Sequence, residues 1–184
     1  HCNSAYPSTH AEMNLKFMEN LKNLYRIPIG FSDHTTDLLS SKTAIALGAN
    51  VIERHFTLDK KMEGPDHILS STKEEMKELV KFKGNINNYD IWRKKLNTQD
   101  RKKVDLILGD GIKKIQPNEY ITINSQKKSL YAKRDIKKGE KFSFGNVTIK
   151  GPAGGLLPKF LNIITNRKST MKISKDEPIT WKSF

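Results

Sequence analysis

Residues 29–56 read IGFSDHTTDLLSSKTAIALGANVIERHF, and this stretch decides the fold of the 184-residue chain. It begins and ends with runs rich in β-branched and aromatic residues, which are typical of buried strands. The segment between them has apolar residues at helical spacing and stops at Gly48, a residue type that commonly terminates helices. Strand, helix and strand in so short a span predict two parallel strands joined by a crossover helix.

The same alternation extends to both sides of this stretch. On the N-terminal side, residues 2–6 form a strand-like run, and Thr9 with Glu12 predicts a capping box at the start of a helix. On the C-terminal side, Ser71 with Glu74 predicts the cap of a further helix. Three such units are too few for a closed parallel barrel, which needs about 250 residues.

The second half of the chain has a different character. Residues 96–121 are polar and are interpreted as a linker, and residues 122–184 contain short β-type runs separated by Gly and Pro, as in a small β domain. Residues 1–95 hold 14 basic and 12 acidic residues, whereas residues 96–184 hold 19 and 8. This difference in charge supports a division into two domains.

Polar side chains gather at the ends of successive expected strands. Because side chains alternate along a strand, Ser32 and His34 share one face, and Glu53 and His55 share a face of the next strand. Parallel β/α proteins place their active sites at the carboxyl ends of the strands. The imidazoles of His34 and His55 are therefore candidate ligands for a divalent ion, with Glu53 or water completing the coordination.

Two further groups of residues belong to this end of the expected sheet. Cys2, Ser4 and Tyr6 share a face of the first strand. Asp66 lies in the loop MEGPDH, where barrel enzymes place substrate-contacting loops.

Each of these features also has a structural interpretation. Two histidines alone make a weak metal signal, because a strand histidine can be a hydrogen-bonded core or rim residue. Asp66 follows a Gly-Pro pair, and aspartate is common in plain turns. The basic second region is interpreted as a solvated lysine-rich surface rather than a nucleic-acid interface, because aromatic residues are not interleaved with the basic ones in a stacking pattern.

Composition narrows the class of protein. The net charge is +13, and no apolar run approaches the roughly 20 residues of a membrane span. We therefore expect a soluble, cytoplasmic protein without a signal peptide. The single cysteine, Cys2, excludes an internal disulfide framework and a cysteine-built zinc site. The chain runs from His1 straight into a strand-like segment, which suggests that it starts inside a larger protein.

Several motifs, taken in order, resemble the sialic acid synthase family. In the first region they are HCNSAYP, IGFSDHT, GANVIERHFTLD and GPDH. In the second region SLYAKRDIKKGEKF, NVTIKGPAGGLLPKF and ISKDEPIT resemble the antifreeze-like domain of these synthases, also called SAF, which has a β-clip fold. The fold implied is α/β: the C-terminal portion of a TIM (β/α)8 barrel over residues 1–95, a linker over 96–121 and a SAF domain over 122–184.

The resemblance implies a transferase that forms a carbon–carbon bond from phosphoenolpyruvate. C3 of phosphoenolpyruvate adds to the aldehyde of open-chain N-acetylmannosamine or a related 2-acetamido sugar while water attacks C2, giving N-acetylneuraminate or a related nonulosonic acid plus phosphate. A divalent ion, Mn²⁺ or Mg²⁺, is implied as the cofactor that polarises the aldehyde.

Seven residues match functional positions of the family. They are His34 and His55 as metal ligands, Glu53 as the carboxylate beside the metal, Ser4 and Ser32 as phosphoenolpyruvate contacts, and Tyr6 and Asp66 as contacts of the acceptor sugar. The resemblance further implies a domain-swapped homodimer in the full-length protein, and neither nucleic acid nor membrane is an expected partner.

Two departures from the family limit these expectations. Gly151 stands where the family commonly has an arginine that reaches the partner's acceptor sugar, so Lys150 or Lys159 would have to supply the positive charge. The first five β/α units are absent from the sequence, so we expect this piece by itself to be inactive. Alternatives left open are a legionaminic or pseudaminic acid synthase, and a non-enzymatic remnant that binds carbohydrate through its SAF domain.

Overall fold

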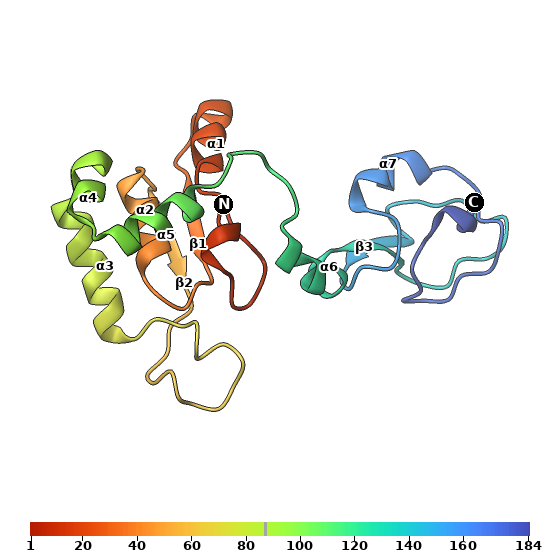
Figure 1. Cartoon of the computed structure of the whole chain (residues 1–184). Coiled ribbons are helices and arrows are strands. Elements are labelled where there is room, and N and C mark those ends of the chain that lie inside the picture. The colour runs from red at the N-terminus through yellow and green to blue at the C-terminus, as the bar shows by residue number, and fades with distance from the viewer. Residues whose placement is uncertain (87) are drawn as a thin grey trace. The chain divides into compact units, whose positions relative to one another are not determined.

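The computed structural model describes residues 1–86 and 88–184 and divides the chain into two compact units, His1–Glu119 and Tyr120–Phe184 (Figure 1). The first unit contains α1 Phe17–Tyr25, β1 Gly30–Asp33, α2 Leu39–Ala46, β2 Val51–Arg54, α3 Lys73–Asn85, α4 Tyr89–Lys95 and α5 Thr98–Leu108. The second contains α6 Tyr120–Gln126, β3 Ser129–Ala132, β4 Val147–Lys150 and α7 Leu161–Ile164. Among the described residues, no helix is long and apolar enough to cross a membrane.

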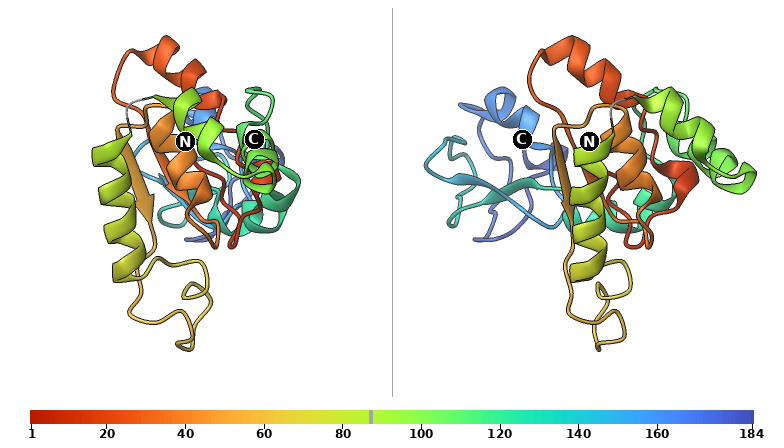
Figure 2. Two further views of the ribbon diagram at one scale, coloured as in Figure 1. Left: turned by 60° about the vertical axis from the view of Figure 1, so that its left-hand side comes forward. Right: turned by 90° about the vertical axis from the view of Figure 1, so that its left-hand side faces the viewer.

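A small parallel sheet organises the first unit. β1 pairs with β2 in parallel, and Ser32 lies opposite Glu53 in the register. Single parallel bridges extend the sheet on both sides, from Cys2 to Ser32 and from Phe56 to Ser71. Helix α2 packs on this sheet, and α3 and α5 pack on α2 (Figures 1 and 2). The repeating strand-and-helix pattern read from the sequence is thus confirmed.

The core of this unit lies between the sheet and its helices. Phe31 is 1% exposed and packs with residues from both neighbouring helices, Ala44 of α2 and Ile107 of α5. Burial of each large apolar side chain contributes roughly 1.5 to 3 kcal/mol. Because Phe31 faces the helices, its neighbour Ser32 faces the opposite side of the sheet, as the alternation of strand side chains requires.

The segment expected to be a linker is largely part of the first unit. Within residues 96–121, helix α5 buries Val104 and Ile107 completely. Asn97 caps this helix by accepting a hydrogen bond from the Asp100 N–H at 2.8 Å. Two buried residues three positions apart are enough to fix a helix that is otherwise polar, and the boundary between the units moves to Glu119.

The first helix begins later than Thr9 and Glu12 suggest. A short 3₁₀ turn covers His10–Glu12, and α1 starts only at Phe17. Asn14 lies between the 3₁₀ turn and α1 and has a φ of 52°. Its side-chain oxygen accepts from the Gly111 N–H at 2.7 Å, and its side-chain amide donates to the Ile112 carbonyl at 2.9 Å. The turn is therefore shaped by contacts with the segment after α5.

The capping box of α3 lies one residue beyond the predicted position. Thr72 and Glu75 form it, because Ser71 is used elsewhere: its hydroxyl accepts from Nε of Arg54 at 2.6 Å, and its N–H donates to the His55 carbonyl at 2.7 Å. The predicted first strand is likewise shorter than residues 2–6, since only Cys2 forms a bridge.

The second unit is a small β domain with its own core. β3 and β4 are antiparallel, and Leu130 and Ala132 of β3 are fully buried. Their cluster includes Phe142 and Ile179 from the loops around the strands. Gly139 lies in a turn between them with a φ of 82°, a conformation that favours glycine.

Acid should weaken the second unit through Glu140. The Lys137 N–H at 3.0 Å, the Arg134 guanidinium at 2.8 Å and the Asn146 amide at 3.0 Å hold the pKa of this carboxyl at about 2. A carboxyl whose pKa is lower in the folded state stabilises the fold above its unfolded pKa and loses that effect as pH falls toward its folded pKa. We expect the protection factors of the β3 and β4 amides, which are their intrinsic exchange rates divided by the observed rates, to fall between pH 4.5 and 2, and less so in Glu140→Gln.

The matched control is Glu177→Gln, which alters another carboxylate that receives a backbone hydrogen bond, from the Ser174 N–H at 2.7 Å. An equal flattening of the pH profile in both variants would contradict this role of Glu140.

Candidate functional site

Three aromatic rings meet at the carboxyl ends of the strands in the first unit. The ring of Tyr6 stacks on His34 with centroids 4.1 Å apart, and lies edge-on to His55 at 5.5 Å. The rings of His34 and His55 are themselves 5.4 Å apart. Partial burial, and the nearby Cys2 and Asp66, raise the pKa of the Tyr6 phenol. The phenol is therefore a hydrogen-bond donor at neutral pH.

The orientation of His34 is set by the main chain. This residue is 4% exposed, and its Nδ1 lies 2.8 Å from the Asn3 carbonyl oxygen. A carbonyl can only accept, so Nδ1 carries a proton, and in the neutral form of the ring Nε2 is the atom that has the lone pair. Over residues 1–86 and 88–184, no group of three or more His, Cys, Asp or Glu side chains is arranged to hold a metal ion.

Asp66 reaches the same cluster from the loop between β2 and α3. Its Oδ2 lies 3.7 Å from Nδ1 of His55. The loop is held by a hydrogen bond between Thr57 and His67 at 2.7 Å, and by the Ser70 hydroxyl, which donates to the Asp66 carbonyl at 2.7 Å. Tyr6, His34, His55 and Asp66 are therefore brought together.

The two predicted serines lie beside carboxylates. Ser32 donates its hydroxyl proton to Glu53 Oε1 at 2.7 Å, so these two residues share a face as the register implies. Ser4 instead donates to Glu119 Oε1 at 3.1 Å. No local pattern in the sequence indicates Glu119 as a partner of Ser4, because the two residues are 115 positions apart.

A buried ion pair on the opposite face of the strands supports this cluster. Nη1 of Arg54 pairs with Oδ2 of Asp33, and neither side chain has any exposed surface. The same guanidinium donates to the carbonyls of Thr35 at 2.8 Å and Leu69 at 3.2 Å. It thus connects the strand ends to the loop that carries Asp66. The alternation of side chains along a strand is consistent with Asp33 and Arg54 facing the same side, but it does not indicate that both are completely buried.

In the second unit, Lys150 is engaged locally. Its Nζ pairs with Asp176 and lies 5.1 Å from the ring centroid of Tyr131. Lys159 lies 5.1 Å from the ring centroid of Phe160. A Cβ added at Gly151 would approach the carbonyl oxygen of Ser125 at 3.8 Å, an ordinary contact distance.

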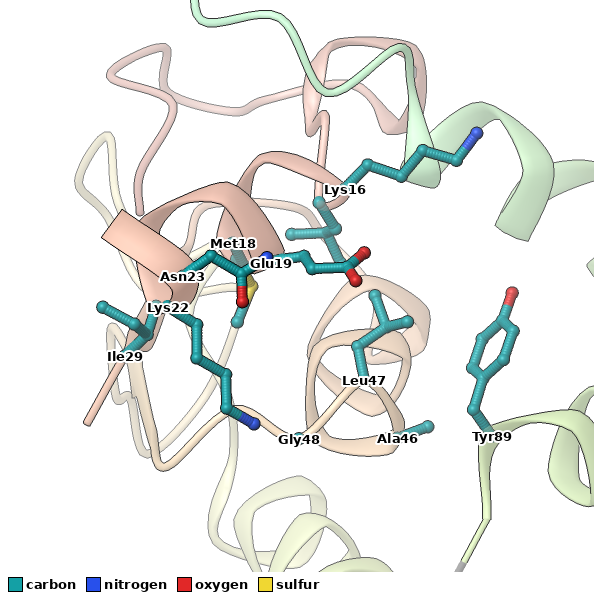
Figure 3. A pocket seen from close by; sticks show the side chains of 11 residues that line it. Lys16, Met18, Glu19, Lys22, Asn23, Ile29, Ala46, Leu47, Gly48 and Tyr89 are labelled. Atoms are coloured by element: carbon teal, nitrogen blue, oxygen red, sulfur yellow. The ribbon is translucent and has the colours of Figure 1, made fainter. Parts of the chain in front are cut away.

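One pocket of the first unit lies away from this cluster. It has a volume of about 400 Å³ and includes Ile29 and Gly48, which precede β1 and β2, together with Lys22 and Tyr89 (Figure 3). It therefore lies at the amino ends of the strands. In β/α barrels, residues at the amino ends of the strands contribute to stability, whereas the active site lies at the carboxyl ends.

The order of elements and the position of the cluster define a class: a portion of a TIM barrel with polar groups at its strand ends, followed by a small β domain. Residues 1–90 match the NeuB family, and residues 127–184 match the SAF domain. The first region of the chain is therefore similar to the NeuB family, and relatives of the whole chain include legionaminic acid, pseudaminic acid and N-acetylneuraminate-9-phosphate synthases.

Individual relatives support this assignment. The chain is 42% identical over 181 residues to an uncharacterised protein of Methanocaldococcus jannaschii, covering 98% of this chain and 48% of that protein. It is 42% identical over 179 residues to N,N′-diacetyllegionaminic acid synthase of Campylobacter jejuni, and the match covers 97% of this chain and 48% of that synthase. Spore coat polysaccharide biosynthesis protein spsE of Bacillus subtilis has a similar structure, with a TM-score of 0.75 and 28% sequence identity. This match covers 100% of this chain and 51% of the spsE chain. The chain spans about half the length of these relatives.

Proposed function

We propose that this chain forms the metal- and acceptor-binding end of a nonulosonic acid synthase. The reaction is the condensation of phosphoenolpyruvate with N-acetylmannosamine or a related 2-acetamido sugar, in which water attacks C2 of phosphoenolpyruvate and phosphate is released. The observation that supports it most directly is the cluster of Tyr6, His34, His55 and Asp66, since these residues match the family's motifs and lie together at the strand ends.

His34 and His55 are the proposed ligands of a divalent ion, Mn²⁺ or Mg²⁺. The hydrogen bond from Nδ1 of His34 to the Asn3 carbonyl fits this role, because it leaves Nε2 as a lone-pair donor. Asp66 Oδ2 lies 3.7 Å from Nδ1 of His55, and a carboxylate oxygen is a donor of the kind that Mn²⁺ accepts. Glu53, which accepts a hydrogen bond from Ser32, is the proposed carboxylate beside the metal. When bound, such an ion would act as a Lewis acid toward the acceptor's aldehyde.

The side chains of this chain would bind and orient the two substrates. The Tyr6 phenol can donate to a sugar oxygen, and the ionised Asp66 can accept from sugar hydroxyls. Ser32, bonded to Glu53, is the proposed phosphoenolpyruvate contact, which requires its hydroxyl to turn away from Glu53 when that substrate binds. The stacking of Tyr6 on His34 keeps the sugar-binding group beside a proposed metal ligand.

The acceptor is one of two kinds of sugar. N-acetylmannosamine would give N-acetylneuraminate, and a diacetamido-trideoxyhexose would give legionaminic or pseudaminic acid. We propose the diacetamido sugar, because 42% identity to the C. jejuni legionaminic acid synthase exceeds the 32% identity to the human N-acetylneuraminate-9-phosphate synthase. We also propose a cytoplasmic, domain-swapped homodimer, as in the family that the sequence resembles.

A chimera tests this function. This chain would replace the matching segment of the C. jejuni synthase, to which it aligns over 179 residues. We expect phosphate release from phosphoenolpyruvate that requires both an acceptor sugar and Mn²⁺ or Mg²⁺, with the diacetamido sugar preferred to N-acetylmannosamine. A chimera that unfolds cooperatively on heating but releases no acceptor-dependent phosphate, beside an active C. jejuni parent, would refute the proposal.

A further inference from the structure

Residues 57–72, which connect β2 to α3, form a loop that carries Asp66 and extends away from the strands (Figure 1). Its outer part is exposed, with Leu58 84% and Met62 48% exposed. The base of the loop is closed by the Thr57 N–H, which donates to the Ser71 carbonyl at 3.0 Å. The position of Asp66 therefore depends on the contacts made within the loop.

The side chain of His67 is held on two sides within this loop. Its Nδ1 lies 2.7 Å from the hydroxyl oxygen of Thr57, a residue that is only 4% exposed. Gly64 lies on the side of Cδ2 and Nε2, and a Cβ added to it would be 3.0 Å and 3.3 Å from these two ring atoms. Gly64 also has a φ of 141°, which disfavours any residue with a Cβ. Its backbone thus approaches the ring more closely than another residue would allow.

Asp66 lies between these two residues, two positions after Gly64 and directly before His67. Its carbonyl accepts from the Ser70 N–H at 3.1 Å and from the Ser70 hydroxyl at 2.7 Å. These bonds hold the backbone of Asp66, but the direction of its carboxylate, which lies 3.7 Å from Nδ1 of His55, also depends on the flanking residues. Loss of the His67 ring would release residues 64–67 from Thr57 and let the carboxylate move away from His55.

We propose that His67 is a positioning residue for the acceptor sugar, because its bond to Thr57 and its contact with Gly64 keep the Asp66 carboxylate beside His55. The inference rests on the proposed synthase function, in which Asp66 contacts the acceptor. His67 acts on the sugar through Asp66, so its substitution weakens acceptor binding and leaves phosphoenolpyruvate binding unchanged.

Two substitutions of His67 separate its hydrogen bond from its bulk. The Thr57 hydroxyl can donate or accept, so His67→Asn, which places an amide two bonds beyond Cβ like Nδ1, can keep the bond. His67→Leu fills similar space without any hydrogen-bonding group.

Amide exchange in the intact protein tests the loop without any assay of activity. His67→Leu should lower the protection of the Ser70 amide, which donates to the Asp66 carbonyl, by about 5- to 20-fold, and His67→Asn by less than about twofold. His10→Leu is the matched control, since His10 pairs with Asp37 at 3.1 Å elsewhere in the same unit. Unchanged protection of Ser70 in His67→Leu would overturn the proposal.

Kinetics of the chimera that tests the proposed function show whether His67 acts through Asp66. His67→Leu should raise KM for the acceptor sugar about 5- to 20-fold, the size expected for one hydrogen bond, and leave kcat and KM for phosphoenolpyruvate within about twofold. Gly64→Ala should raise KM for the acceptor likewise, because its Cβ would press on the ring, and His67→Asn should stay within about threefold of the parent. In an Asp66→Ala background, His67→Leu should change this KM by less than about twofold, because the group that the ring positions is gone.

The possible failures are distinguishable. An active chimera in which His67→Leu leaves KM for the acceptor unchanged, or raises it equally with and without Asp66, would overturn this inference alone. An unsubstituted chimera that releases no acceptor-dependent phosphate would refute the synthase function and, with it, the role of His67 in acceptor binding.

Discussion

His34→Ala is expected to reduce turnover on the order of 1,000-fold in the synthase that contains this chain. The substitution removes one of two proposed imidazole ligands, and loss of Lewis-acid assistance is worth several kcal/mol of transition-state stabilisation. It also removes the ring on which Tyr6 stacks at 4.1 Å. His55→Ala should have a similar effect, because the two rings lie 5.4 Å apart and belong to the same proposed site.

The measurement is phosphate release by the chimera described above, together with Mn²⁺ binding followed by electron paramagnetic resonance. His10→Ala is the matched control, because His10 pairs with Asp37 at 3.1 Å and is not a member of the ring cluster. Retention of more than a tenth of the activity, or of unchanged Mn²⁺ affinity, in His34→Ala would refute the assignment of this ligand.

Arg54→Met is expected to lower the free energy of unfolding of the first unit by about 3 to 5 kcal/mol, the range for breaking a buried ion pair. Both Arg54 and Asp33 have no exposed side-chain surface. Without the guanidinium, the carboxylate of Asp33 would keep hydrogen bonds from Thr35 and Ser41 but no compensating charge. The carbonyl of Leu69 would also lose its donor, which loosens the loop that carries Asp66.

Urea unfolding of the intact protein measures this effect. Arg93→Met is the matched control, since Arg93 pairs with Asp105 at 2.6 Å on the surface, where such pairs contribute at most about 1 kcal/mol. The double variant Arg54→Met/Asp33→Leu should recover part of the loss, because it leaves no unpaired buried charge. A loss below about 1 kcal/mol in Arg54→Met would contradict the role given to this pair.

Local patterns predicted much of the first unit. The alternation of strand side chains placed Ser32 and Glu53 on one face and Asp33 and Arg54 on the other, and the structure pairs them accordingly. Capping signals were less reliable, because they compete with other uses of the same residues. Ser71 bonds to the strand end at His55, so the cap of α3 falls on Thr72.

The sequence by itself determined the alternation of strands and helices and the small β domain after it. It also determined which polar side chains come to the carboxyl ends of the strands, because these properties depend on periods of two and about 3.6 residues. Only the tertiary structure decided that α5 belongs to the first unit and that Ser4 is bonded to Glu119. Contacts between residues about 100 positions apart depend on how the elements pack, and no local period in the sequence encodes them.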